Sequence, residues 1–90
     1  MKEVIFLELN DTTIELVSVQ NPSPKSADPW QIGYRMFALE VEDMDEAITY
    51  LKSKDVVISM EPVNLGKSKR AEIKDSDGLT IELRQWLETW

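Results

Sequence analysis

The sequence contains neither cysteine nor histidine, and these two absences exclude several kinds of functional site. Without cysteine there is no disulfide framework and no thiolate metal centre. Without histidine the chain lacks the commonest nitrogen ligand for metals and the usual proton shuttle near neutral pH. Ser-His-Asp and Cys-His catalysis are excluded as well. Any chemistry therefore has to come from carboxylates, Tyr, Lys, Arg, Ser or Thr.

Long apolar runs and an excess of positive charge are also absent. No apolar run approaches the roughly 20 residues that span a bilayer, and no leader peptide is recognisable, so we expect a cytoplasmic protein without a membrane partner. The net charge of −7 argues against nucleic acid as a partner and allows attraction of a cationic ligand. We interpret the short basic cluster Lys67-Ser68-Lys69-Arg70 as a solvated turn.

Runs of β-branched and alternating residues predict several strands around one helix. Asp43 with Glu46 three residues later is typical of a helix start, and apolar residues recur at helical spacing after it. The strand after the helix is expected to end at Glu61-Pro62. The expected elements are a hairpin over 4–19, a proline-rich connector over 21–33, a strand over 34–41, a helix over 43–54, and strands over 56–60, 69–74 and 79–86.

The tetrapeptide TIEL occurs twice, at Thr13–Leu16 and at Thr80–Leu83. Each copy follows turn residues and lies in a segment with strand character, which favours a true internal repeat over coincidence. Only the second copy is preceded by a strand, a helix and a further strand. The sequence therefore predicts a single α+β domain over residues 1–90. It consists of an N-terminal β-hairpin (1–20), a linker (21–33) and a complete βαβββ module (34–86).

One stretch resembles a known family closely. The strand ending in VEDMDEAI, the downstream EPV and the turn and strand KDSDGLTIEL resemble the second module of the vicinal oxygen chelate superfamily, which includes glyoxalase I, methylmalonyl-CoA epimerase, extradiol dioxygenases and bleomycin-resistance proteins. Ser76 stands where proline is usual in that turn. FLELNDTTIELVSV looks like the end of a first module, so the hairpin is interpreted as the remnant of one.

The resemblance implies paired modules whose strands curl around a cleft, where family enzymes hold a divalent metal. Each module gives one ligand from its first strand, usually His or Gln, and one glutamate from its last. The glutamate positions match Glu15 and Glu82, the candidate metal ligands and candidate catalytic bases. The first-strand position of the complete module falls on Met36, a soft thioether that suits a hard cation poorly. We interpret the metal site as degraded, with no cofactor or only a weakly bound divalent ion.

Strand alternation supports part of this assignment independently of the resemblance. In each TIEL the Ile and Leu share one face and the Thr and Glu share the other. Met36 and Ala38 alternate onto the cleft side of their strand, and Trp86 lies four residues past Glu82 on the same face. Because the chain is rich in large rings (Trp30, Trp86, Trp90 and Tyr34), we expect Met36, Ala38 and Trp86 to contact a ligand that is cationic or aromatic in character.

These observations favour a small-molecule-binding protein of the glyoxalase/bleomycin-resistance type. One alternative is a metal-dependent lyase, isomerase or epimerase using Glu15 and Glu82, and another is a non-catalytic dimeric interaction protein or gene remnant. Whether the protein is an enzyme stays open at this point. One module and a half leaves strand edges unpaired, so a homodimer is expected.

Overall fold

The computed structural model describes residues 3–24, 27–28, 30–33 and 36–88. The chain forms two compact units, Met1–Gln31 and Ile32–Trp90, and each is described by itself. Tyr34 and Trp90, two of the expected rings, lie outside the described residues. Within the described ranges no helix has both the length and the apolar character that crossing a membrane requires.

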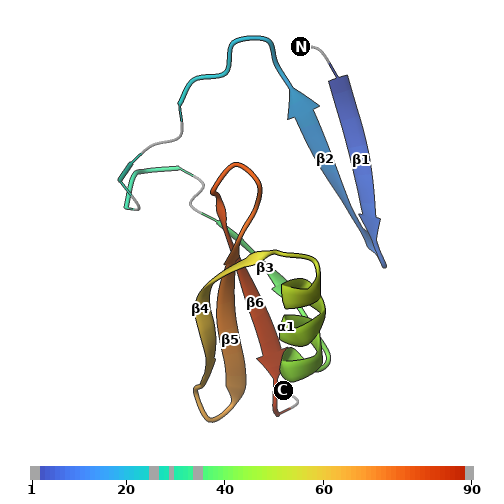
Figure 1. Ribbon diagram of the computed structural model, residues 1–90, viewed down its shortest axis with the longest axis vertical. Coiled ribbons are helices and arrows are strands. Elements are labelled where there is room, and N and C mark those ends of the chain that lie inside the picture. The colour runs from blue at the N-terminus through green and yellow to red at the C-terminus, as the bar shows by residue number, and fades with distance from the viewer. Residues whose placement is uncertain (1–2, 25–26, 29, 34–35, 89–90) are drawn as a thin grey trace. The chain divides into compact units, whose positions relative to one another are not determined.

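The first unit contains one antiparallel hairpin (Figure 1). Strand β1 (Glu3–Leu9) pairs along its whole length with β2 (Thr12–Ser18), and Leu9 is paired with Thr12. The turn between them therefore holds only Asn10 and Asp11, as the sequence predicts. Asn10 has a φ of +53°, a conformation that asparagine adopts more readily than most residues.

The second unit is a four-stranded sheet with one helix (Figure 1). The strands lie in the order β3-β6-β5-β4; β3 is parallel to β6, and the other neighbours are antiparallel. A βαβββ module preceded by a hairpin is the α+β fold that the sequence predicts, and it is confirmed. The bounds are β3 Phe37–Glu40, α1 Met44–Ser53, β4 Val57–Asn64, β5 Ser68–Lys74 and β6 Thr80–Trp86.

The helix begins where the capping residues predict. The carboxylate of Asp43 accepts a hydrogen bond from the backbone N–H of Glu46 at 3.0 Å, which satisfies one of the unpaired donors of the first turn. A second donor, the N–H of Met44, bonds to Oε1 of Gln85 at 2.7 Å. Gln85 belongs to β6, so the start of α1 is attached directly to the sheet.

The core lies between α1 and one face of the sheet. Alternation along β5 and β6 turns Ala71, Ile73 and Leu83 toward the helix, where they pack with Met44 and Ile48. The residues of β5 and β6 that alternate with these core residues therefore point to the opposite face of the sheet. Partly buried side chains extend the core: Leu39, Val41, Leu51, Val56, Ile58 and Ile81.

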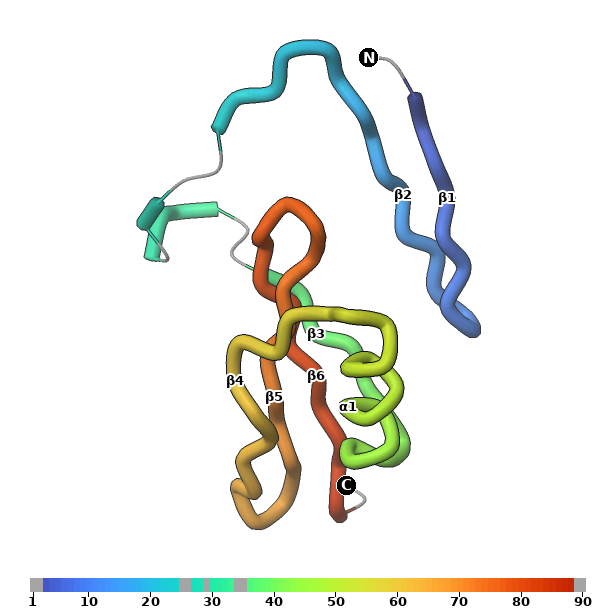
Figure 2. The backbone as a smooth tube through the Cα atoms, in the orientation of Figure 1, coloured from blue at the N-terminus to red at the C-terminus, as the bar shows by residue number. Residues whose placement is uncertain are grey.

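The prediction that Glu61-Pro62 ends the fourth strand was wrong. Strand β4 continues through Pro62 to Asn64, with shifts in register between Ile58 and Met60 and between Met60 and Val63. Strand β4 is at the edge of the sheet, where a residue without an N–H is tolerated, and the bulges absorb the irregularity. The trace of β4 can be followed in Figure 2.

Two further boundaries differ from the sequence predictions. Strand β3 runs over Phe37–Glu40, and Met36 and Val41 lie outside it, although the N–H of Val41 still bonds to the carbonyl of Arg84 at 2.8 Å; residues 34 and 35 of the predicted strand lie outside the described residues. The solvated-turn interpretation of the basic cluster was wrong for its last three residues. Ser68 is buried and begins β5, because the hairpin turn ends at Lys67. Arg70 lies within β5, as the strand predicted over 69–74 implies.

Candidate functional site

Glu82 lies in the middle of the face of the sheet that points away from α1. Its neighbours in β6, Ile81 and Leu83, pack against the core, so alternation directs the carboxylate to the other side. Across the sheet Glu82 is in register with Ala38 on β3 and with Glu72 on β5. The side chain keeps only 15% of its surface exposed.

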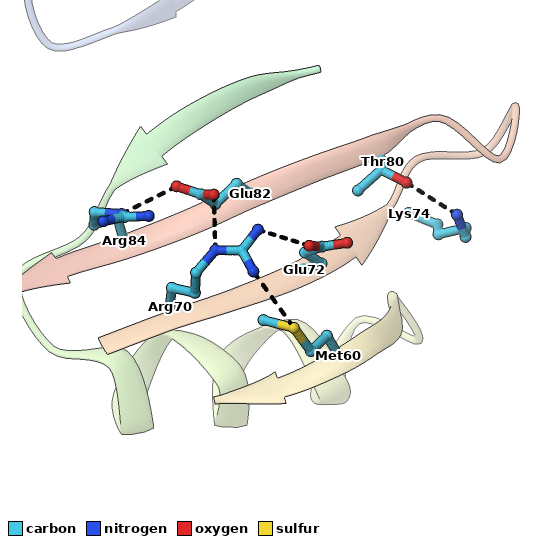
Figure 3. Close-up of polar contacts among 7 residues, drawn as sticks. All are labelled: Met60, Arg70, Glu72, Lys74, Thr80, Glu82 and Arg84. Atoms are coloured by element: carbon cyan, nitrogen blue, oxygen red, sulfur yellow. Dashed lines mark hydrogen bonds and ion pairs between the residues drawn. The ribbon is translucent and has the colours of Figure 1, made fainter. Parts of the chain in front are cut away.

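Both carboxylate oxygens of Glu82 accept hydrogen bonds from arginine (Figure 3). Nε of Arg70, on β5, donates to Oε1 at 2.8 Å. Nε of Arg84, two residues further along β6, donates to Oε2 at 3.0 Å. Charge-assisted bonds of this kind are about twice as strong as neutral ones. Glu82 is therefore held in place by two cations of the chain itself.

Arg70 is the centre of this cluster. Besides Glu82 it bonds through Nη2 to Oε2 of Glu72 at 2.7 Å, and its Nη1 lies 3.6 Å from the sulfur of Met60. Glu72 and Glu82 face each other across β5 and β6, where two like charges would repel. Arg70 bridges them, and with Arg84 the four side chains carry no net charge.

The pKa of Glu82 reflects these contacts. Partial burial by itself raises the pKa of the carboxyl, but hydrogen bonds and charge attraction from Arg70, together with the nearby Arg84, outweigh burial and leave the pKa below its ordinary value of 4.5. Glu82 is thus a carboxylate at neutral pH and a weaker proton acceptor than a free glutamate. The bond to Glu82, followed by the bond to Glu72, raises the pKa of Arg70, which stays charged.

The other predicted site residues are distributed over both units. Ala38 is exposed beside Glu82, and Met36 is half-buried just before β3. Trp86 lies at the end of β6 with 40% of its surface exposed, and the guanidinium of Arg84 lies 5.3 Å from its ring centroid. Glu15 belongs to the hairpin, where it is exposed and paired with Phe6. An approach of Glu15 to Glu82 stays a prediction.

The surroundings of Glu82 do not fit a divalent cation. Each carboxylate oxygen already accepts a hydrogen bond from a guanidinium, which takes up one lone pair of each oxygen and places positive charge beside both. The positive charges of Arg70 and Arg84 also stand where a cation would have to approach. Among the described residues, no group of three or more Asp or Glu side chains is placed to hold a metal ion.

Sequence reasoning missed Arg70 and Arg84, although the signal was present. Both share a face with Glu82 by simple alternation. Arg84 is two residues beyond Glu82 in β6. In β5, Arg70 shares its face with Glu72, which pairs with Glu82, whereas Ala71 points to the core. The strand predicted over 69–74 already contains Arg70, but residues 67–70 were also interpreted as a solvated turn, so Arg70 was not assigned to Glu82. The register between β5 and β6 pairs Glu72 with Glu82 and Arg70 with Arg84, so Arg70 reaches Glu82 diagonally rather than from the opposite position.

This fold, with a glutamate on the last strand of a βαβββ module, agrees with the sequence comparison. A sequence profile of the Glyoxalase/Bleomycin resistance protein/Dioxygenase superfamily matches residues 1–83. The chain therefore belongs to that superfamily. None of the curated proteins is similar enough to match the chain.

Solved structures of family members share the fold. A glyoxalase family protein from Bacillus cereus is 22% identical with a TM-score of 0.74, over 94% of this chain and 62% of that one. A glyoxalase family protein from Enterococcus faecalis is 26% identical with a TM-score of 0.69, over 90% and 65%. For a glyoxalase/dioxygenase from Nostoc punctiforme the values are 24% and 0.70, over 94% and 61%. The chain thus spans less than two thirds of the length of these three proteins.

Proposed function

We propose that this chain is a metal-independent, small-molecule-binding member of the superfamily, in which arginine takes the place of the metal at Glu82. The observation that carries the proposal is the occupation of both Glu82 oxygens by Arg70 and Arg84. In a metal-using relative a divalent cation would neutralise such a glutamate. Here the chain supplies the positive charge itself, and no cation is needed to hold the carboxylate in the sheet.

The face around Glu82 has the mixed character of a small-molecule site. Charged groups occupy its centre, and apolar side chains lie around them: Ala38 beside Glu82, Met60 beside Arg70 and Trp86 at the end of β6. Binding sites for organic molecules commonly combine a few fixed polar groups with apolar and aromatic surface. The expected contacts through Ala38 and Trp86 are consistent with this arrangement, and Met36 is retained as a proposed third contact.

A homodimer is part of the proposal, because one sheet face is not yet an enclosed site. Strand β3 lies at the edge of the four-stranded sheet with Phe37 48% exposed, and edge strands of this kind are prone to pair with another chain. A second copy would supply a second such face, so that ligand is held between two modules. We propose a cytoplasmic setting for this dimer.

Calorimetric titration with Mn²⁺ tests the metal-independent function. We expect no binding to the unaltered protein up to millimolar Mn²⁺. Arg70→Gln should bind the ion more tightly than the unaltered protein, because Glu72 and Glu82 then face one another without the bridging cation. Lys74→Gln, which removes an equal charge from the same face, is the control and should not gain affinity.

The opposite result would restore the metal-dependent alternative. Micromolar Mn²⁺ affinity in the unaltered protein, abolished by Glu82→Gln, would mean that the arginines move away and a cation enters. That outcome would favour a lyase, isomerase or epimerase in which Glu82 is a ligand.

A further inference from the structure

The two arginines on the sheet face differ in how many of their nitrogen atoms are already used. All three nitrogens of Arg70 have partners, namely Glu82, Glu72 and the sulfur of Met60. Arg84 uses only Nε, toward Glu82. In the part of the chain that the structure describes, neither Nη1 nor Nη2 of Arg84 donates a hydrogen bond. All donor nitrogens of Arg70 are thus engaged, whereas Nη1 and Nη2 of Arg84 are still available to a ligand.

Arg84 is nevertheless held firmly in one orientation. Its Nε is fixed by the 3.0 Å bond to Glu82, and its guanidinium lies 5.3 Å from the centroid of the Trp86 ring. The side chain is only 27% exposed. A guanidinium fixed at Nε and packed against a ring has lost much of its rotamer freedom before a ligand arrives. Its Nη1 and Nη2 are therefore preorganised donors.

We infer that Arg84 and Trp86 form an anchor for a ligand carrying a planar carboxylate beside a flat aromatic body. This inference rests on the proposed small-molecule function and names the ligand class of that site. Nη1 and Nη2 donate to the two carboxylate oxygens, a geometry that suits guanidinium and that the ammonium of lysine cannot reproduce. The aromatic body packs on the exposed part of the Trp86 ring.

The charges around Arg84 permit a carboxylate and also predict how its affinity can be tuned. Glu82 is already compensated, because Arg70 bonds to it from the other side. Glu40, on β3, is in register with Arg84 but forms no ion pair with it within 4.0 Å in the described structure. Its uncompensated charge opposes an arriving anion. Neutralising Glu40 should therefore strengthen binding, an effect opposite to that of neutralising Arg84.

Three probes that share one ring and differ in the attached group test the anchor. They are naphthalene-2-carboxylate, the neutral 2-naphthamide and the cationic 2-naphthylmethylammonium, each titrated calorimetrically into the full-length protein at low salt. We expect the carboxylate to bind about tenfold more tightly than the amide, since hydrogen bonds between charged groups exceed neutral ones. The cation should bind most weakly, although the net charge of −7 by itself favours it.

Variants assign the preference to particular side chains. Arg84→Gln should reduce carboxylate affinity to that of the amide, and Arg84→Lys should recover only part of it because lysine lacks the paired donors. Lys74→Gln removes the same charge from the same face and should change affinity less than twofold. Glu40→Gln should increase carboxylate affinity severalfold at low salt, with the gain shrinking as salt screens the charge. Circular dichroism establishes that each variant is folded.

The outcomes separate failure of the anchor from failure of the proposed function. Equal or tighter binding of the amide or the cation, or equal losses in Arg84→Gln and Lys74→Gln, overturns the anchor and leaves a small-molecule site of another specificity. Absence of binding by all three probes at millimolar concentration also overturns it. Glu82-dependent Mn²⁺ binding would instead contradict the metal-independent function on which the anchor rests.

Discussion

At the scale of single residues, Glu82 is part of an internal ion-pair cluster on the face of the sheet that points away from α1. Glu82 keeps its place on the sheet, but its charge is balanced by Arg70 and Arg84. Such partly buried pairs hold geometry at a modest net gain in stability, because desolvation offsets much of the attraction. Arg70 and Arg84 fix the carboxylate in position, and in the described structure Arg84 uses only its Nε for this contact.

The depressed pKa of Glu82 makes stability depend on pH. The carboxyl has a lower pKa in the folded protein than its ordinary 4.5, so ionised Glu82 contributes its full stabilisation above that value and loses it as pH falls through the folded pKa. In urea unfolding, we expect the free energy of unfolding to decrease below about pH 4.5. Glu82→Gln should show a smaller decrease than the unaltered protein.

Glu42→Gln provides the matched control for this experiment. Glu42 is exposed and lies outside the cluster, so its loss should leave the decrease toward acid pH as large as in the unaltered protein. A Glu82→Gln protein with an unchanged acid profile would contradict the assigned role of the Arg70 and Arg84 contacts.

Residue-level reasoning from the sequence was successful where one periodicity decides the outcome. Alternation along TIEL is enough to separate Leu83 from Glu82, because a strand has only two faces. The partners of Glu82 depend in addition on the register with β5 and on the reach of long side chains, because Arg70 bonds to Glu82 diagonally across the two strands. Arg70 was therefore missed, even though its own face could be read from Ala71.

At the scale of elements, local chemistry accounts for most boundaries. Asp43 begins α1 as its capping pattern predicts, whereas Pro62 did not end β4, since an edge strand need not donate from every residue. The turn before β6 is defined just as locally. Oδ1 of Asp75 accepts from the N–H groups of Asp77 and Leu79 at 2.9 and 2.8 Å, and Gly78 adopts a φ of +80°.

Gly78→Ala isolates the backbone contribution of that turn. No atom lies within 4 Å of the position that a Cβ would occupy, so the substitution introduces no clash and only the left-handed conformation opposes it. We expect a loss of about 1–2 kcal/mol in the free energy of unfolding, measured with urea. Asp77→Ala changes an exposed neighbour in the same turn and should cost less than about 0.5 kcal/mol. Equal losses in the two variants would contradict this account.

At the scale of the whole molecule, the hairpin offers an apolar face that suits the proposed dimer. One of its faces is almost entirely aliphatic, because Ile5 pairs with Leu16 and Leu7 pairs with Ile14. Between 41% and 47% of the surface of Ile5, Leu7, Leu9 and Leu16 is exposed. A two-stranded hairpin is marginally stable by itself in water, and apolar patches of this kind usually mark an interaction surface. We therefore place the proposed homodimer contact on this face.

Sedimentation velocity over a range of concentrations tests that placement. We expect the unaltered protein to be dimeric at micromolar concentration. Replacing Leu7 and Leu16 with serine together should raise the dissociation constant at least about a hundredfold, since each buried leucine contributes about 1.5–3 kcal/mol and 1.4 kcal/mol corresponds to a factor of ten. Val57→Ser removes an exposed aliphatic side chain from the other unit and should leave assembly unchanged. A monomeric unaltered protein would contradict the dimer, whereas a dimer that survives the double replacement would move the interface to the open edge of β3.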